Sequence, residues 1–317
     1  MISFLLIPLF IIYKQLFFKM DLVEGLKALK PNLTDSSAIT YASTLRSMRA
    51  TLQLNGTINA KMIRKHWISI IEYIRSKSPK QRKVIASAVL ILTNDVNRIA
   101  TLKNIILHSN KEDNINEEKQ ELSSFQKQGW ANWNDILEKR QELEEEIQPL
   151  WTKLNLSKKE FRRIEDLVIL SLFTHNAPRR LLDYCLMSNG EPESDKVNGI
   201  DFSAEPSFIF NVYKTSKKYG PQVIPINPTL YSLLREYMKL NKSEWLITNN
   251  KDQRMSPQQM NKRLSRIMNK KHFGVNILRH SYVSDVLKGM PFLDDIKKTA
   301  TELGHSMSET LLYKKHN

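Results

Sequence analysis

Four short polar clusters in the second half of the chain carry side chains suited to holding a phosphate group. Arg180 opens a predicted helix, Lys214 follows a predicted strand, and Arg279 lies in an Asn-Ile-Leu-Arg-His run. The fourth cluster is Leu-Gly-His, ending at His305, with Tyr313 eight residues further on. Arginine grips phosphate oxygens bidentately, and a lysine at a hairpin tip can reach a phosphate. The histidine or the tyrosine alone would be typical of a structural residue, so only the whole set is informative.

The first cluster contains two adjacent arginines, and the sequence leaves open which one is functional. A helix beginning near Pro178 would place Arg180 and Asp183 three positions apart on one face. The carboxylate could then hold the guanidinium rigid. Most pairs with this spacing are surface ion pairs, and Arg179 is the alternative candidate.

The charge of the chain points to a polyanionic partner. Lysine and arginine number 48 against 33 aspartates and glutamates, a net charge of +15. Nucleic acid is the first candidate and an acidic membrane surface the second. The charge is +9 in residues 20–110, −6 in 111–150 and +10 in 151–317. This pattern favours two DNA-facing domains joined by a segment that does not touch DNA; two ordinary basic domains with a solvated linker are the alternative.

Composition and length exclude several classes of protein. With 41% apolar and 26% charged residues, the chain is neither collagenous, wholly disordered nor a polytopic membrane protein. A single cysteine, Cys185, excludes a disulfide framework and a cysteine-based zinc ribbon and favours a reducing compartment. We expect an intracellular protein that is not secreted.

The first 19 residues form an apolar extension that differs from the rest. The uncharged run 1–13 is shorter than the ~20 residues that a membrane-spanning helix needs. No positive residue precedes it and no small-residue cleavage site follows. We expect translation to begin at Met20, so that residues 1–19 are not native; a membrane anchor is the alternative.

Hydrophobic periodicity predicts a mainly α protein with a small β-hairpin, an α+β fold. We expect a helical DNA-binding domain over 20–110, an acidic helical linker over 111–156 and a catalytic domain over 157–317. The hairpin strands are predicted at 207–213 and 222–226.

In order and spacing, the four clusters resemble the tyrosine recombinases, the phage-integrase family. The resemblance covers about residues 160–315 and extends more loosely to 34–110, as the family's helical core-binding domain. Asn276 departs from the family, whose box usually reads His-x-Leu-Arg-His, and the interval to the tyrosine is eight where many members have nine. The Pro-Arg-Arg…Asp-Tyr box and the tryptophan-containing linker look more like integrases of DNA viruses and mobile elements.

The resemblance implies a metal-independent DNA strand-transferase that cuts and rejoins DNA through a 3′-phosphotyrosine. Tyr313 would be the nucleophile, and Arg180 and Arg279 would stabilise the charge on the nonbridging oxygens. Lys214 would protonate the leaving 5′-oxygen. His305 would hydrogen-bond the phosphate or assist the tyrosine.

Three further residues have supporting or altered roles under this resemblance. Asn276 can donate a hydrogen bond but cannot take up a proton near neutral pH, so we expect a slower enzyme or a reassigned base. His280 is expected to pack and orient its helix, and Asp183 to support Arg180. We expect no cofactor and no metal.

DNA contacts are expected from both basic blocks. Lys262, Arg266 and Lys270 follow one another at four-residue spacing, which favours one helical face toward DNA, with a solvated face as the alternative. The candidate contact residues are Lys217, Lys218, Lys262, Arg263, Arg266 and Lys270.

By the same resemblance, the protein would be a two-domain, C-shaped clamp that assembles as a homo-tetramer on two double-stranded DNA sites. No small-molecule substrate or membrane is expected. Integration of viral or mobile-element DNA is the expected activity; excision and resolution stay open, as do nucleus, virus factory and cytoplasm. A type IB-like topoisomerase and a catalytically weakened DNA-binding protein of the same fold are the alternatives.

Overall fold

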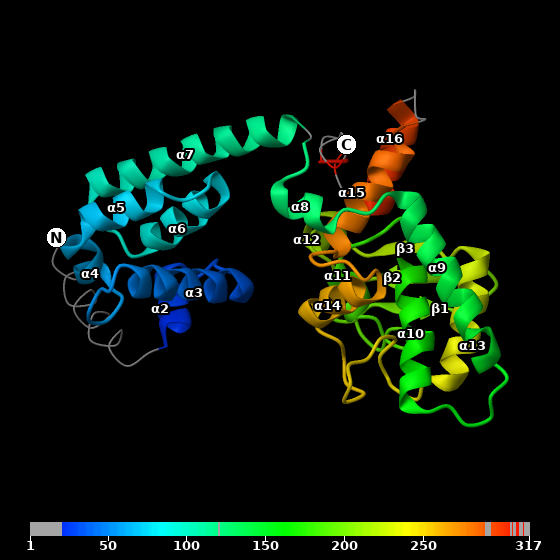
Figure 1. Cartoon of the computed structure of the whole chain (residues 1–317). Coiled ribbons are helices and arrows are strands. Elements are labelled where there is room, and N and C mark those ends of the chain that lie inside the picture. Colours follow the sequence, from blue (N-terminus) through cyan, green and yellow to red (C-terminus); the bar gives the residue numbers. More distant parts are fainter. Residues whose placement is uncertain are drawn as a thin grey trace. The chain divides into compact units, whose positions relative to one another are not determined.

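The computed structural model describes residues 21–119, 121–288, 293–304, 306, 309, 310 and 313, and the chain divides into two units, Met1–Lys119 and Gln120–Asn317 (Figure 1). The apolar extension 1–19 and His305 lie outside the described residues. Within the described ranges, no helix combines the length and apolarity needed to cross a bilayer.

The first unit is a bundle of helices. Its elements are α2 (Leu22–Leu29), α3 (Asp35–Thr51), α4 (Ala60–Lys65), α5 (Trp67–Arg75), α6 (Pro79–Ile91) and α7 (Val96–Glu118). The side chain of Thr34 accepts a hydrogen bond from the Ser37 N–H and starts α3, while Ser78 and Gln81 form a capping box at α6. Ile, Leu, Ala, Met and Val side chains make up its core.

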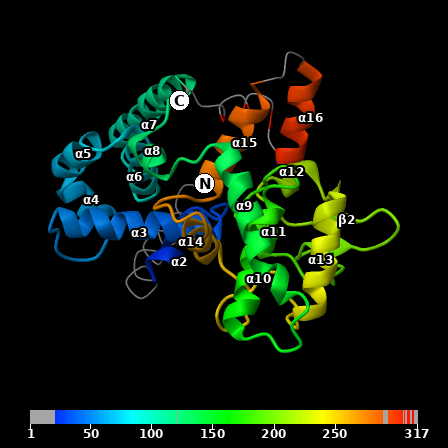
Figure 2. The same cartoon turned by 45° about the vertical axis from the view of Figure 1, so that its right-hand side comes forward.

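The second unit combines helices with one small sheet. Its helices are α8 (Ser124–Gly129), α9 (Trp133–Ile147), η1 (Gln148–Leu150), α10 (Lys158–Leu172), α11 (Leu181–Cys185), α12 (Ser216–Tyr219), α13 (Pro228–Leu240), α14 (Pro257–Ile267), α15 (Val275–Val286) and α16 (Leu293–Leu303). The largely buried helix α10 is central: α9, α13 and α14 pack against it (Figure 2).

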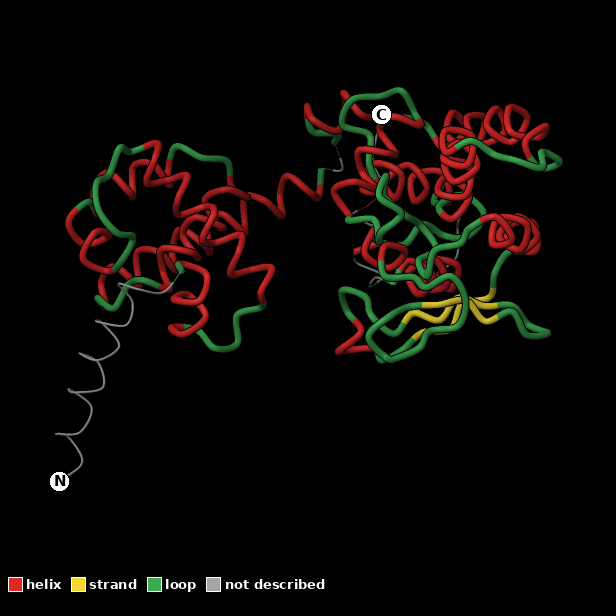
Figure 3. Tube along the Cα trace, turned by 90° about the horizontal axis from the view of Figure 1, so that it is seen from below, coloured by secondary structure: helices red, strands yellow, loops and turns green. Residues whose placement is uncertain are grey.

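The sheet contains β1 (Gly199–Asp201), β2 (Ser207–Phe210) and β3 (Gln222–Pro225) in the order β1-β2-β3, all antiparallel (yellow in Figure 3). Phe208 pairs with both Ile200 and Ile224 across the sheet. The inward-facing residues of β2, Phe208 and Phe210, are buried against the core of the second unit. The predicted fold class, mainly α with a small sheet, is confirmed.

The acidic segment 111–156 does not form one separate linker. Its first residues continue α7 in the first unit, whereas α8, α9 and η1 belong to the second. The sparse apolar positions of α9 explain this: Trp133, Ile136, Leu143 and Ile147 are buried in the same core as α10. The acidic face of α9 remains exposed while its apolar stripe packs.

Candidate active site

Arg279 is a buried cation at the centre of the site. It lies on α15, where its side chain is 0% exposed, and its guanidinium donates to the Pro178 carbonyl and, at 3.3 Å, to the Leu303 carbonyl. These bonds join three segments that are far apart in the sequence. Burial lowers the pKa of Arg279, while the charge of Tyr313 and a side-chain hydrogen bond with it act in the opposite direction.

Tyr313 lies beside this arginine, within the same chain. Its half-buried ring is 5.4 Å from the guanidinium carbon of Arg279 and packs in an apolar cluster that includes Val283 and Leu303. On the other side, the ring stacks on His280 at 4.5 Å between centroids, and the His280 Nδ1 is 2.8 Å from the Tyr313 carbonyl oxygen. The expected packing role of His280 is therefore matched by a contact with the candidate nucleophile itself.

The two adjacent arginines have different surroundings. Arg179 is 2% exposed; its Nε donates to Asp183 at 2.9 Å, its Nη1 donates to Gln222 on β3 at 2.9 Å, and it lies 4.0 Å from the Phe210 ring centre. These contacts attach the sheet to α11. Arg180, whose side chain is 18% exposed, points instead toward the segment that carries Tyr313.

Asp183 is buried and bonded to Arg179, not to Arg180 as the spacing suggested. The reason is geometric: Arg180 is the N-cap of α11, with an extended backbone that directs its side chain away from that helix. Burial raises the pKa of Asp183, and the charges of Arg179, Arg279 and Arg180 oppose this rise. All three guanidinium groups are therefore close enough to act on one carboxylate, which sets up a strongly positive site.

The chain matches the phage integrase family over residues 181–317, a segment that begins one residue after Arg180 and includes Arg279 and Tyr313. Residues 181–317 form a phage integrase family domain. No curated protein matches the chain. Among solved structures, the crystal structure of XerA recombinase is similar to this chain. The alignment covers 96% of this chain and 93% of the XerA chain, at 13% sequence identity and a TM-score of 0.40. An identity and a TM-score this low transfer neither a function nor the role of a residue.

Lys214 is exposed in a turn of the second unit. Strand β2 ends at Phe210, earlier than predicted, so Lys214 lies in the connection to β3 and not at a strand end. Lys217 and Lys218 are exposed on α12, within the same connection. Asn276 is exposed in the first turn of α15, three residues before Arg279.

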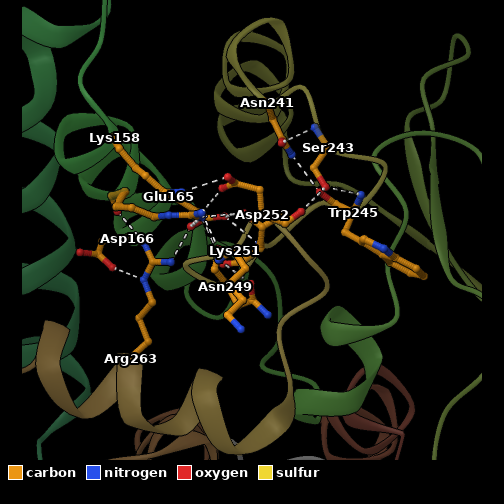
Figure 4. Close-up of polar contacts among 12 residues, drawn as sticks. Lys158, Glu165, Asp166, Asn241, Ser243, Trp245, Asn249, Lys251, Asp252 and Arg263 are labelled. Carbon is orange, nitrogen blue, oxygen red and sulfur yellow. Dashed lines mark hydrogen bonds and ion pairs between the residues drawn. The ribbon is translucent and has the colours of Figure 1, made fainter.

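Arg263 corrects the predicted set of DNA contacts. It is 8% exposed, and its guanidinium donates to Glu165, Asp166 and the Arg162 carbonyl inside the second unit (Figure 4). Arg263 is therefore not one of the exposed cations of α14 that face solvent. Burial alone would lower the pKa of Arg263, but the two carboxylates raise it overall.

The predicted basic face of α14 is only partly present. Lys262 and Arg266 are exposed on the helix, and Arg266 also contacts the Asp166 carboxylate at 3.1 Å. Lys270 lies beyond the end of α14, and its ammonium donates to the Trp130 carbonyl at 2.9 Å. The four-residue spacing could not reveal that the helix stops at Ile267.

Sequence reasoning missed several residues that build the site. Asn261 on α14 accepts the Val275 N–H at 3.1 Å and so caps α15, which has no side-chain cap of its own. Gly304 has φ +67°, a left-handed value that explains the glycine of the Leu-Gly-His cluster. Glu309 contacts Arg180 at 3.3 Å. Of these three residues, only Glu309 could have been found from the sequence, because it lies four residues before Tyr313, a spacing at which helical side chains are neighbours.

Metal binding has no support among the residues described. In that part of the chain, no three His, Cys, Asp or Glu side chains are grouped so that they could hold a metal ion.

Proposed function

We propose that this chain is a site-specific DNA recombinase that cuts and rejoins double-stranded DNA through a 3′-phosphotyrosine. One observation supports this most directly: Tyr313 lies 5.4 Å from Arg279 of the same chain, with Arg180 close enough for its charge to act on Arg279. The candidate nucleophile and Arg279 lie in the segment that matches the phage integrase family, and Arg180 directly precedes that segment.

The chemistry follows from these groups. The Tyr313 oxygen attacks phosphorus and gives up its proton to water, and the bond from phosphorus to the 5′-oxygen breaks. Arg180 and Arg279 donate to the nonbridging oxygens, whose negative charge grows in the transition state. Lys214 gives a proton to the leaving 5′-oxygen, and attack by a 5′-hydroxyl reverses the sequence and rejoins the strand. The arginines would supply the positive charge that a metal supplies elsewhere.

Three further residues near the centre have proposed roles. Asn276 would donate a hydrogen bond to the phosphate, since it lies one helical turn before Arg279 on α15. His305 would contact the same phosphate, because it directly follows Gly304, whose carbonyl oxygen is 3.5 Å from Arg180. Asp183 would hold Arg179 and, through it, the sheet that precedes Lys214.

DNA binding would use the exposed cations of both units. Lys217, Lys218, Lys262 and Arg266 are the candidates in the second unit, in contact with phosphates. We further propose a two-domain clamp, a homo-tetramer on two DNA sites, and integration of viral or mobile-element DNA inside a cell. These parts of the proposal rest on the resemblance of the sequence clusters.

A nicked suicide substrate tests the proposal. Wild-type protein is incubated with duplexes randomised around the nick, and covalent adducts are isolated and sequenced, which also yields the target site. We expect adducts with wild type and none with Tyr313→Phe. Tyr282→Phe is the matched control: this tyrosine packs in the same apolar cluster, and burial raises its pKa to about 12.

The outcomes separate the alternative functions. DNA binding without any wild-type adduct would contradict catalysis and favour a DNA-binding protein of this fold. Adducts and relaxation of supercoils without strand exchange between two duplexes would favour a topoisomerase. Adducts with Tyr313→Phe would exclude Tyr313 as the nucleophile.

A further inference from the structure

Of the three arginines around Asp183, Arg180 is the one whose guanidinium remains partly exposed. Arg179 and Arg279 are 2% and 0% exposed and are bonded to Asp183, Gln222 and backbone carbonyls. The Arg180 side chain is 18% exposed; its Nη1 is 3.5 Å from the Gly304 carbonyl oxygen and its Nη2 is 3.3 Å from Glu309 Oε1. The Glu309 side chain is itself 42% exposed.

The position of Glu309 on the guanidinium is informative. A guanidinium binds an anion bidentately through Nη1 with Nη2, or through Nε with Nη2, so Nη2 takes part in both arrangements. The chain itself shows both. Arg82 binds Glu112 through Nη1 and Nη2 at 3.1 and 2.6 Å, and Arg163 binds Glu146 through Nε and Nη2 at 2.7 and 2.5 Å. With Arg180, Glu309 makes one longer contact, and it makes that contact with the shared nitrogen.

We infer that Glu309 is an internal competitor for the DNA phosphate at Arg180. This inference rests on the proposed function, in which Arg180 binds the phosphate under attack. A phosphate that binds Arg180 bidentately must take Nη2 from Glu309 and gains a second hydrogen bond in exchange. Two shorter charge-assisted bonds are stronger than one long bond, so the exchange favours DNA.

The competition has a consequence for the nucleophile. Glu309 is four residues before Tyr313, so its contact ties Arg180 to the segment that carries the attacking hydroxyl. When a phosphate binds Arg180, the contact between Arg180 and Glu309 is lost, and this is the step in which Tyr313 must approach phosphorus. The carboxylate therefore also disfavours occupation of Arg180 by weakly bound anions.

Binding to short duplex DNA of mixed sequence at low salt tests the competition without needing the target site. We expect Glu309→Gln to bind about threefold more tightly than Glu302→Gln, as expected for loss of a partly exposed ion pair. Glu302→Gln removes the same charge from a nearby half-buried position and controls for the change in net charge. In an Arg180→Ala background, Glu309→Gln should bind no more tightly than its parent.

Each result either supports or contradicts the competition between Glu309 and the phosphate. Equal affinity of Glu309→Gln and Glu302→Gln, or the same gain with Arg180→Ala, would overturn the competition and leave the proposed recombinase untouched. Tighter binding that depends on Arg180 would support it, even if wild type formed no adduct and the proposed function failed. Circular dichroism of each variant checks that it is folded.

Discussion

The two units treat their charged residues in opposite ways. Across residues 21–119, the buried side chains are apolar apart from Ser109, and ion pairs such as Arg46–Asp21 are exposed. The second unit buries six charged side chains among its described residues: Glu165, Asp166, Arg179, Asp183, Arg263 and Arg279. One unit keeps charge at its surface, and the other builds charge into its interior.

The difference fits the two tasks of the proposed function, which are binding to the DNA backbone and cleavage of one phosphodiester. Exposed cations cost little to maintain and suit contacts with a DNA backbone that do not depend on sequence. A buried cation costs desolvation energy and persists only when its donors are bonded, but those bonds fix its direction. Under the proposed function, catalysis needs a cation of fixed direction, which accounts for the cost that the second unit carries.

The sharpest test replaces a buried cation by another cation. Arg279→Lys keeps the positive charge but loses the planar guanidinium, whose two Nη atoms donate hydrogen bonds to the Pro178 and Leu303 carbonyls. We expect the rate of adduct formation to fall about 10²- to 10³-fold, the effect of removing one transition-state donor. Single-turnover cleavage and duplex binding are measured together. An equal loss of cleavage rate and of binding affinity would show that the direction of the buried cation does not matter. It would also remove the contrast between the two units.

Stability offers a direct comparison of buried and exposed pairs. Glu165→Ala removes the buried carboxylate that Arg162 and Arg263 share, and we expect it to lower the free energy of unfolding by about 3–5 kcal/mol. Glu112→Ala in the first unit breaks an exposed pair with Arg82 and should cost about 1 kcal/mol or less. Urea titration followed by circular dichroism measures both. Similar costs would mean that the buried network is not a structural requirement.

An exposed cation of the second unit should behave like those of the first. Lys262→Ala is expected to weaken duplex binding several-fold and to reduce the salt dependence by about one phosphate contact. Lys239→Ala is the matched control, because Lys239 is exposed on α13 and pairs with Glu236. Binding over a range of salt concentrations measures the slope. Equal slopes for Lys262→Ala and wild type would place α14 away from DNA.

The smallest expected effect concerns pH and a partly buried histidine. Burial, and secondarily the charge of Arg140, lowers the pKa of His175 to about 4. The unfolded chain binds a proton near pH 6.5, so stability should fall as pH falls from about 6.5 toward 4. His175→Asn should reduce that fall, which urea midpoints at about pH 7 and pH 5.5 would show. An unchanged pH dependence would mean that His175 is as solvated as a surface residue.

Much of the secondary structure and the order of the clusters were readable from the sequence. Thr34, Ser78, Ser157 and Ser256 are of residue types that favour the start of a helix, and a helix begins directly after each of them. The end of a predicted strand was less accurate: β2 stops at Phe210 and not at residue 213, because a strand end depends on the residues that pack against it.

By itself, the sequence determined the two-part distribution of charge, the mainly helical fold and the set of residues that could act on a phosphate. Only the tertiary structure decided which arginine does what. Arg179 and Arg180 are neighbours of the same type, and Lys262 and Arg263 are neighbours of the same charge, yet Arg179 and Arg263 are buried whereas Arg180 and Lys262 are not. Burial and partner choice arise from segments more than 40 residues apart, such as Arg179 with Gln222 and Arg263 with Asp166. No local pattern can encode these contacts, because each depends on how distant elements pack.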